Sequence, residues 1–342
     1  MASRSNVGFD KLSVIRALDQ MLWPTTLLAA RLVAKIPRRR TESPVIIRPG
    51  GMGDLICVHM AMEHLGIDPQ SYTWVVETRS MPWVSLMDLP HRIISPRLAL
   101  AVAKYRHVVN SEQHYGASQI IAIAMAGRGR NVTSLSTVRG SYTATNIVPY
   151  SPIRTHEMKS FVNLLRAAHN LGDDGRDIAR TRTTANTGQL VVALGGGHAE
   201  SRSLDVDQWE EVIKKWTDGK DFVMIAGPVE TPMAQELEHR FGGRAVLRTG
   251  NFGENCGVIA GAHRVLTMDG GLTHVASYHG VPTDTLFTSG QDDLWAPLAK
   301  GSRVFADRSI ECRPCTMFGF TPRCPVGHLC KAHLPGEVLP AV

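Results

Sequence analysis

Short runs of apolar, β-favouring residues recur along the chain, and residues at helical spacing lie between many of them. The runs expected to be strands in the first half are residues 45–47, 72–76, 92–94, 107–109 and 119–123. Those expected in the second half are residues 190–194, 222–226, 245–247, 265–268 and 283–287. Strands that alternate with helices in this way predict an α/β fold, with a doubly wound parallel sheet in the second half.

The predicted helices and loops divide the chain. Helices are expected over residues 11–36 with an interruption at Pro24, over 55–62, 156–171 and 232–240, and over 206–216 with Asp205 as the N-terminal cap. Residues 126–150 are rich in polar residues and glycine and predict a loop, and residues 172–188 predict a polar linker. The boundaries that follow are a basic N-terminal arm (1–41), a first domain (42–180), a second domain (186–310) and a cysteine-rich segment (311–342). Both domains have a glycine turn after the first strand, which predicts two Rossmann-like domains facing each other across a cleft.

Charge is concentrated in the N-terminal arm. Residues 1–41 contain eight Lys or Arg against two Asp, so they carry the whole formal charge of +6 of the 342-residue chain. A nucleic-acid-binding protein usually spreads basic charge over its folded surface, so nucleic acid is not expected as a partner. The arm combines an apolar helical stripe with the basic run 38–40. It is expected either to lie on an anionic membrane surface or to pack on the first domain, with the arginines as a solvated linker.

Features of secreted and membrane-spanning proteins are missing from the sequence. No window holds the roughly 18 apolar residues that a membrane span needs, and the N-terminus lacks the order of a signal peptide. Six cysteines, four of them near the C-terminus, do not form a secreted disulfide pattern. We therefore expect a cytoplasmic protein, with peripheral association at the inner face of the cytoplasmic membrane as the further expectation for the arm.

A strand, a glycine turn and a helix meet at the sequence Arg-Pro-Gly-Gly-Met-Gly-Asp, residues 48–54. Such a junction lies at the carboxyl end of a strand, where open α/β sheets bind ligands, so Asp54 would be presented at the mouth of the sheet. The glycine spacing is neither that of a dinucleotide-binding turn nor that of a P-loop. The alternative is that the glycines only permit the turn and that Asp54 only caps the helix.

A second glycine turn, Asp-Gly-Gly-Leu-Thr-His at residues 269–274, follows the predicted strand 265–268. Backbone N–H groups at a helix N-terminus favour a diphosphate. The alternative is an ordinary loop in which His274 packs inside.

Four cysteines near the C-terminus follow the pattern C-x2-C-x8-C-x5-C: Cys312, Cys315, Cys324 and Cys330. Four thiols at this spacing predict a structural tetrahedral site for Zn or Fe, with His328 and His333 as substitute ligands. The alternative is four reduced thiols in a loop.

The turn at residues 47–54 resembles the N-terminal signature of glycosyltransferase family 9, the bacterial lipopolysaccharide heptosyltransferases, in which the corresponding aspartate is the proposed catalytic base. The turn at 269–274 is similar to the Asp-x-Gly-x-x-His signature of that family for the donor pyrophosphate, and Gly280-Val281-Pro282 follows in matching order. The resemblance implies a GT-B type fold with Asp54 as base. It also implies a cation for the donor phosphates, and counting back from Trp209 places Arg202 where the family has lysine.

The resemblance implies two groups of site residues. The donor group comprises Gly197, His198, Arg202, Glu230, Asp269, Gly270, Gly271, Leu272, Thr273 and His274, with Glu230 toward the ribose. The acceptor-side turn comprises Gly50, Gly51 and Gly53.

The activity that the resemblance implies is inverting transfer of a sugar from a nucleotide-diphosphate donor, with ADP-heptose favoured, to a hydroxyl of a lipopolysaccharide-like or other cell-surface glycan. No catalytic metal is required, because a helix dipole and an arginine can offset the charge of the leaving group. Two alternatives stay open. In the first alternative the acceptor is a protein, because similar cysteine clusters occur in autotransporter heptosyltransferases. In the second, the chain is a catalytically silent member of the family that only binds nucleotide or acts as a scaffold.

Overall fold

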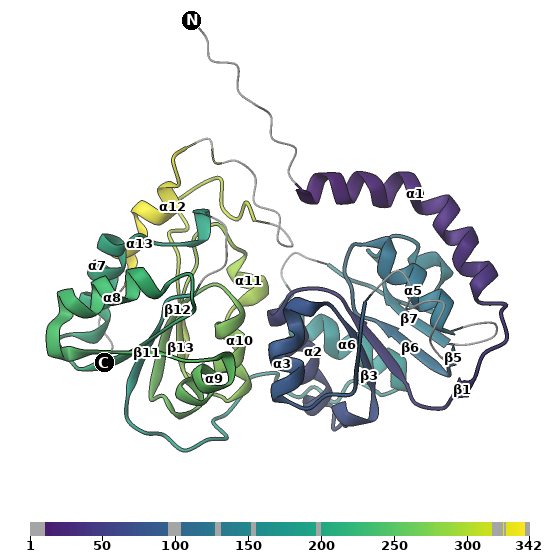
Figure 1. Ribbon diagram of the computed structural model, residues 1–342, viewed down its shortest axis with the longest axis horizontal. Coiled ribbons are helices and arrows are strands. Elements are labelled where there is room, and N and C mark those ends of the chain that lie inside the picture. The colour runs from purple at the N-terminus through teal and green to yellow at the C-terminus, as the bar shows by residue number, and fades with distance from the viewer. Residues whose placement is uncertain are drawn as a thin grey trace, which may run out of the picture. The chain divides into compact units, whose positions relative to one another are not determined.

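The computed structural model describes residues 11–94, 104–126, 131–151, 155–195, 200–316, 324 and 326–338. The chain forms two compact units, each built around a six-stranded sheet (Figure 1). Unit 1 comprises Met1–Gly50, Ala61–Tyr150 and Ser160–Asp173, and unit 2 comprises Gly51–Met60, Ser151–Lys159 and Asp174–Val342. Because these units interleave along the sequence, a single linear boundary such as the one predicted near residues 172–188 separates the sheets but not the units.

The sheet of unit 1 is parallel throughout, with strand order β4-β3-β2-β6-β7-β8. These strands are β2 (Val45–Arg48), β3 (Thr73–Val76), β4 (His91–Ile93), β6 (His107–Asn110), β7 (Asn131–Leu135) and β8 (Asn146–Val148), and β1 (Arg40–Thr41) pairs separately with β5 (Lys104–Tyr105). The helices are α1 (Lys11–Val33), α3 (Met81–Leu86), α5 (Gly116–Ala126) and α6 (Glu157–His169), while α2 (Met52–His64) runs from unit 2 into unit 1. Numbered along the chain, the sheet has the order 3-2-1-4-5-6 of a Rossmann fold.

Unit 2 repeats this topology with the parallel order β11-β10-β9-β12-β13-β14. Its strands are β9 (Leu190–Ala193), β10 (Phe222–Ala226), β11 (Ala245–Thr249), β12 (Arg264–Met268), β13 (Thr283–Leu286) and β14 (Arg303–Phe305). Its helices are α7 (Val206–Thr217), α8 (Thr231–Phe241), α9 (Phe252–Gly261), α10 (Gly271–Tyr278), α11 (Asp292–Trp295), α12 (Leu329–Ala332) and α13 (Leu334–Glu337). The predicted α/β class and the two Rossmann-like units are confirmed.

The core of unit 2 follows from strands that are apolar on both faces. All residues of β9 and β10 are buried, as expected for parallel strands that helices cover on each side. Helix α7 begins at the predicted cap Asp205, whose side chain accepts a hydrogen bond from the backbone N–H of Gln208 (2.9 Å). Its apolar stripe, with Trp209 and Trp216, packs into the core beside these strands.

Three predictions of secondary structure are wrong. Residues 119–123 lie in helix α5 instead of a strand, because a parallel connection from β6 to β7 requires a crossover and this run continues into Ala124–Ala126. Residues 126–150, predicted as loop, contain β7 and β8, since pairing and burial outweigh the weak β-propensity of Asn and Ser. Pro24 does not interrupt α1, although Figure 1 shows that the helix bends along its length.

In the part of the chain that the structure describes, no helix is both long enough and apolar enough to cross a bilayer.

Candidate functional site

Several of the predicted donor residues lie at the switch point of the unit 2 sheet. Strand order reverses between β9 and its neighbour β12, and the loops that leave the carboxyl ends of these two strands diverge. The first loop leads to Arg202 in the 3-10 turn Glu200–Arg202, and the second begins with Asp269. Open α/β sheets bind ligands in the crevice at this position.

Arg202 and Asp269 form an ion pair across the switch point. One guanidinium nitrogen of Arg202 lies 3.0 Å from the Asp269 carboxylate and also donates to the Asp269 backbone carbonyl (2.5 Å). Burial raises the pKa of Asp269, while the positive charge of Arg202 lowers it. The Nε of Arg202 is buried and makes no hydrogen bond to any described residue. The pair therefore holds a cation at the carboxyl edge, and its buried Nε has no partner among the residues that the structure describes.

Helix α10 starts directly beside this pair. Gly270 is its N-cap residue in an extended conformation, and Gly271 is the first helical residue. The side chain of Thr273 donates to the Met268 carbonyl (3.2 Å), and Leu272 packs next to Gly195 at the end of β9. The helix therefore presents its positive dipole end and small residues beside Arg202, as an anion site requires.

His274 lies buried on α10 and contacts the first turns of α2, which belong to the same unit. Its Nδ1 is 3.4 Å from the Cys57 Sγ, and a side chain at Gly53 would collide with the edge of its ring. Burial lowers the pKa of His274 to about 4, with the nearby Asp54 carboxylate acting in the opposite direction. His274 is therefore neutral at pH 7, and it brings the predicted base and the predicted donor turn into one constellation.

Three further residues lie around His274, and none of them was predicted from the sequence to belong to the site. Trp295 packs its ring edge-on against His274, with centroids 5.7 Å apart. His156 accepts a hydrogen bond from the Met158 N–H (3.1 Å), and its Nε2 donates to the Ala296 carbonyl (2.9 Å). The third residue is Cys57, whose Sγ contacts the His274 ring. The residue pattern contained no signal for these contacts, because they join segments far apart in the sequence.

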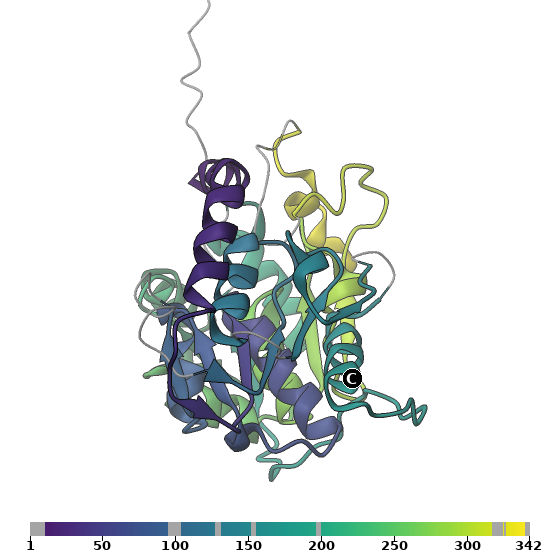
Figure 2. The same cartoon turned by 90° about the vertical axis from the view of Figure 1, so that its right-hand side faces the viewer.

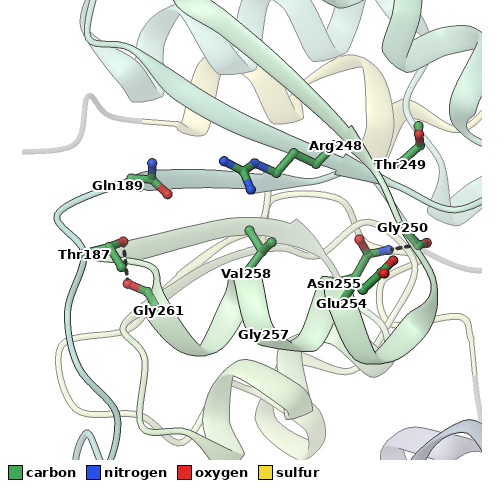
Figure 3. A pocket seen from close by; sticks show the side chains of 10 residues that line it. All are labelled: Thr187, Gln189, Arg248, Thr249, Gly250, Glu254, Asn255, Gly257, Val258 and Gly261. Atoms are coloured by element: carbon green, nitrogen blue, oxygen red, sulfur yellow. Dashed lines mark hydrogen bonds between the residues drawn. The ribbon is translucent and has the colours of Figure 1, made fainter.

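A groove of about 610 Å³ runs between β11 and α9 (Figure 3). Its lining residues are Thr187, Gln189, Arg248, Thr249, Gly250, Glu254, Asn255, Gly257, Val258 and Gly261. Thr249, the last residue of β11, lies directly beside Ala226, the last residue of β10. The turn that follows β10 carries Glu230 at the start of α8. One end of the groove, at Thr249 and Gly250, therefore lies at the carboxyl edge of the sheet, whereas Gln189 and Gly261 at its other end precede strands β9 and β12. Sequence reasoning did not find it, because no motif marks Arg248 or Asn255.

In unit 1, a buried arginine supports the start of the glycine turn at residues 48–54. Arg48 is 2% exposed and donates to the Ser111 carbonyl (2.5 Å) and to the Gln113 side chain (2.8 Å). Its guanidinium lies 3.8 Å from the Glu112 carboxylate and fills the space that a side chain at Gly50 would need. Gly50 is therefore required because Arg48 occupies its Cβ position. Arg48 is part of the sequence motif at residues 48–54, but the motif alone does not indicate this role.

The C-terminal cysteines lie within electrostatic range of one another. Burial raises the pKa of both Cys315 and Cys330, and the neighbouring thiols raise both further. The backbone N–H of His328 donates to the Cys324 Sγ (3.2 Å). Four thiols suit Zn or Fe chemically, but among the described residues no three His, Cys, Asp or Glu side chains stand where a metal ion could be held. The metal site therefore stays a prediction, and no reaction step depends on it.

We expect the purified full-length chain to contain about one Zn or Fe per molecule, because a tetrahedral thiolate set binds one ion. Elemental analysis of anaerobically purified protein measures this ratio. The double variant Cys312→Ser/Cys315→Ser should lose the metal, whereas Cys256→Ser, a buried cysteine of α9, should keep it. Wild-type protein purified without metal would contradict the prediction.

The structure therefore brings six predicted residues into one constellation in unit 2: Gly53, Asp54, Arg202, Asp269, Gly271 and His274. Glu230 lies further out along the edge, next to Gly227. Gly50 lies in unit 1, where its carbonyl accepts a hydrogen bond from the Ser80 hydroxyl (3.1 Å). Gly197 and His198 lie outside the described residues.

Comparison with protein families gives one match. Residues 162–319 match the family model described as Glycosyltransferase family 9 (heptosyltransferase). This segment begins within α6 and contains Arg202, Asp269 and His274. No match was found among curated proteins. The match confirms the resemblance drawn from the sequence motifs over this segment, which is slightly less than half of the chain.

Solved structures share the fold at low sequence identity. E. coli heptosyltransferase WaaC with ADP is 18% identical, with a TM-score of 0.58, over 78% of this chain and 92% of that chain. E. coli ADP-heptose lipopolysaccharide heptosyltransferase II is 14% identical, with a TM-score of 0.58, over 80% and 95%. TibC from enterotoxigenic E. coli, a dodecameric iron-containing heptosyltransferase solved with ADP-D-beta-D-heptose, is 13% identical, with a TM-score of 0.50, over 88% and 74%. These similarities support the GT-B type assignment of the fold.

Proposed function

We propose that this heptosyltransferase-like chain is an inverting glycosyltransferase that moves a sugar, a heptose in the favoured case, from a nucleotide-diphosphate donor to an acceptor hydroxyl. The observation that carries the proposal is the constellation in unit 2. Asp54, neutral His274 and the Arg202–Asp269 pair stand together at the switch point of a Rossmann-like sheet. The family match over residues 162–319 supports the same reading.

In the proposed reaction, the donor phosphates bind between the N-terminus of α10 and the Arg202 guanidinium. Asp54 takes the proton of the acceptor hydroxyl while that oxygen attacks the anomeric carbon in line. The bond from the anomeric carbon to phosphate oxygen breaks, so the nucleoside diphosphate leaves and the configuration inverts. The helix dipole and Arg202 neutralise the negative charge that develops on the leaving phosphate.

His274 serves this reaction as a neutral positioning group. Its ring fills the space against Gly53, so that the turn bearing Asp54 stays close to α10. A side chain larger than hydrogen at position 53 would push the turn away, which accounts for glycine there. Asp269 in turn holds Arg202 through two contacts.

The groove between β11 and α9 is proposed to receive the nucleoside of the donor. The end of the groove at Thr249 and Gly250 lies beside the turn that follows β10, and this turn carries Glu230. A carboxylate at that turn can accept hydrogen bonds from ribose hydroxyls. ADP is the favoured nucleotide, since WaaC was solved with ADP and TibC with ADP-D-beta-D-heptose.

The acceptor is proposed to be a lipopolysaccharide-like or other cell-surface glycan. A protein acceptor is the second candidate. The four-cysteine segment supports it together with the fold similarity to the iron-containing TibC.

Arg202 provides the first test. We expect Arg202→Met to weaken ADP binding by roughly 10- to 100-fold, because a hydrogen bond to a charged group contributes about 1.5–3 kcal/mol. Arg202→Lys should recover part of the affinity while keeping the charge next to Asp269. Isothermal titration of each purified variant with ADP and with ADP-heptose measures the effect.

The matched control is Arg240→Gln, which removes one positive charge from an exposed ion-pair network on α7 and α8. It should leave ADP affinity unchanged. Equal affinity in wild type, Arg202→Met and Arg202→Lys would show that Arg202 does not bind the donor. Failure of the wild type to bind any nucleotide in a panel of nucleotide sugars would overturn the proposed function itself.

A further inference from the structure

Helix α1 carries two apolar faces, and unit 1 covers one of them. The covered face consists of Trp23, Leu27 and Ala30, with Ala34 just beyond the helix end. These residues recur every three or four positions and face α5, which lies along α1 in Figures 1 and 2. The alternative of a helix packed on the first domain is therefore correct for this face.

Specific contacts orient α1 on unit 1. The Asp19 carboxylate accepts hydrogen bonds from the backbone N–H groups of Gly116 (3.2 Å) and Ala117 (3.1 Å), which caps the N-terminus of α5. The indole of Trp23 leaves no room for a side chain at Gly116 or Gly140. Because these contacts define the rotation of α1 about its axis, they also define which residues stay outside.

The outer face of α1 is apolar as well. Met21, Leu28 and Leu32 are 77%, 60% and 54% exposed. Their spacing of seven and four residues places them within about 40° on a helix that turns 100° per residue, on the side opposite Ala30. Leu22 and Ile36 are also exposed at its borders. A contiguous group of exposed apolar side chains on one side of a helix is the kind of surface that marks an interaction site.

Basic residues accompany the outer face. Arg31 and Lys35 are exposed on one flank of the stripe, and exposed Arg39 and Arg40 follow the helix. Residues 20–41 contain five Lys or Arg and no Asp or Glu. The surface defined by Met21, Leu28, Leu32, Arg31 and Lys35, called the α1 outer face below, therefore combines aliphatic side chains with positive charge only.

We infer that the α1 outer face binds an anionic lipid bilayer, lying in its headgroup region. Aliphatic side chains enter the acyl boundary while arginine and lysine meet anionic headgroups, the combination that holds interfacial helices. A second copy of the chain fits less well. A symmetric dimer through this face would bring the two sets of basic residues together with no acidic residue of the segment between them.

The experiment is co-sedimentation of the full-length chain with vesicles. We expect binding to vesicles of phosphatidylcholine with roughly 30% phosphatidylglycerol, because this proportion gives a strongly anionic surface. Arg31→Gln/Lys35→Gln should lower the partition coefficient roughly 30-fold, since each basic residue near the surface contributes about 1 kcal/mol. Leu28→Gln/Leu32→Gln should lower it at least about 10-fold. Both pairs of side chains are exposed, so the variants should keep the wild-type thermal midpoint.

The matched controls make the same kinds of substitution on surfaces outside α1. Lys220→Gln/Lys300→Gln removes two exposed charges from unit 2, and Val246→Gln replaces an exposed apolar residue of β11. Both should bind vesicles as the wild type does. Absence of wild-type binding at low salt, or binding unaffected by either α1 double variant, would overturn the inference. So would a wild-type dimer in solution that Leu28→Gln/Leu32→Gln converts to a monomer, because the second copy would then be the partner.

Discussion

Replacement of Asp54 by Asn is expected to lower the rate of sugar transfer by a factor of about 10² to 10⁴, the usual contribution of a positioned general base. The amide keeps the size of the side chain and its place in the first turn of α2 but cannot accept the proton of the acceptor hydroxyl. Release of nucleoside diphosphate from ADP-heptose in the presence of a glycan acceptor measures the rate. ADP affinity should change less than about threefold, since the phosphates are assigned to Arg202 and α10.

The control for Asp54→Asn is Asp177→Asn, which makes the same change at an exposed aspartate of the segment between the two sheets. It should transfer at the wild-type rate. Undiminished transfer by Asp54→Asn would remove Asp54 from the role of base. Donor binding without turnover by the wild type, with glycan and protein acceptors alike, would favour the catalytically silent alternative.

Replacement of Arg48 by Met should lower the free energy of unfolding by about 3–5 kcal/mol, because it leaves a buried carboxylate without its cation. Glu112 would lose the guanidinium at 3.8 Å, and the Ser111 carbonyl would lose its donor. Denaturant titration of the full-length chain measures the change. If the folded variant can be isolated, its transfer rate should also fall, since Arg48 supports the turn at Gly50 that precedes Asp54.

Two comparisons make the Arg48 prediction specific. Arg106→Met breaks an ion pair with Glu42 of 3.1 Å, but these side chains are 72% and 73% exposed, so its cost should be about 1 kcal/mol or less. The double variant Arg48→Met/Glu112→Gln should be less destabilised than the sum of its single variants, because the unpaired charge is gone. Equal costs for Arg48→Met and Arg106→Met would show that burial does not govern the Arg48 pair.

The local sequence predicted an element correctly wherever a single sequence signal determined its structure. In β10, five consecutive apolar residues predicted a buried strand, and the strand has the predicted bounds Phe222–Ala226. Asp205 begins α7 as predicted, because a capping aspartate acts within its own turn. The run at residues 119–123 failed for the opposite reason. An apolar run can form a buried helix as well as a strand, and only the crossover between β6 and β7 selects the helix.

In the candidate site, too, local features were predictable from the sequence and long-range contacts were not. The two glycine turns were visible as motifs, because each is continuous in sequence and has its own backbone requirement. Their meeting was not visible, since the contacts of His274 with Gly53 and Cys57 join positions more than 200 residues apart. The groove along α9 was missed because it is formed where residues 187–189 meet residues 248–261, and no sequence motif marks either segment.

By itself, the sequence determined the α/β class, strands β9 to β13 and helices α7 and α8 of unit 2, the two glycine turns and the charge of the N-terminal segment. Each depends on interactions within about ten residues along the chain. Only the tertiary structure decided that Arg48 lies beneath Gly50, that His274 is buried and neutral, and which face of α1 is covered. These outcomes depend on which distant side chains occupy the neighbouring space, because burial and close contact arise only when the sheets and helices pack together.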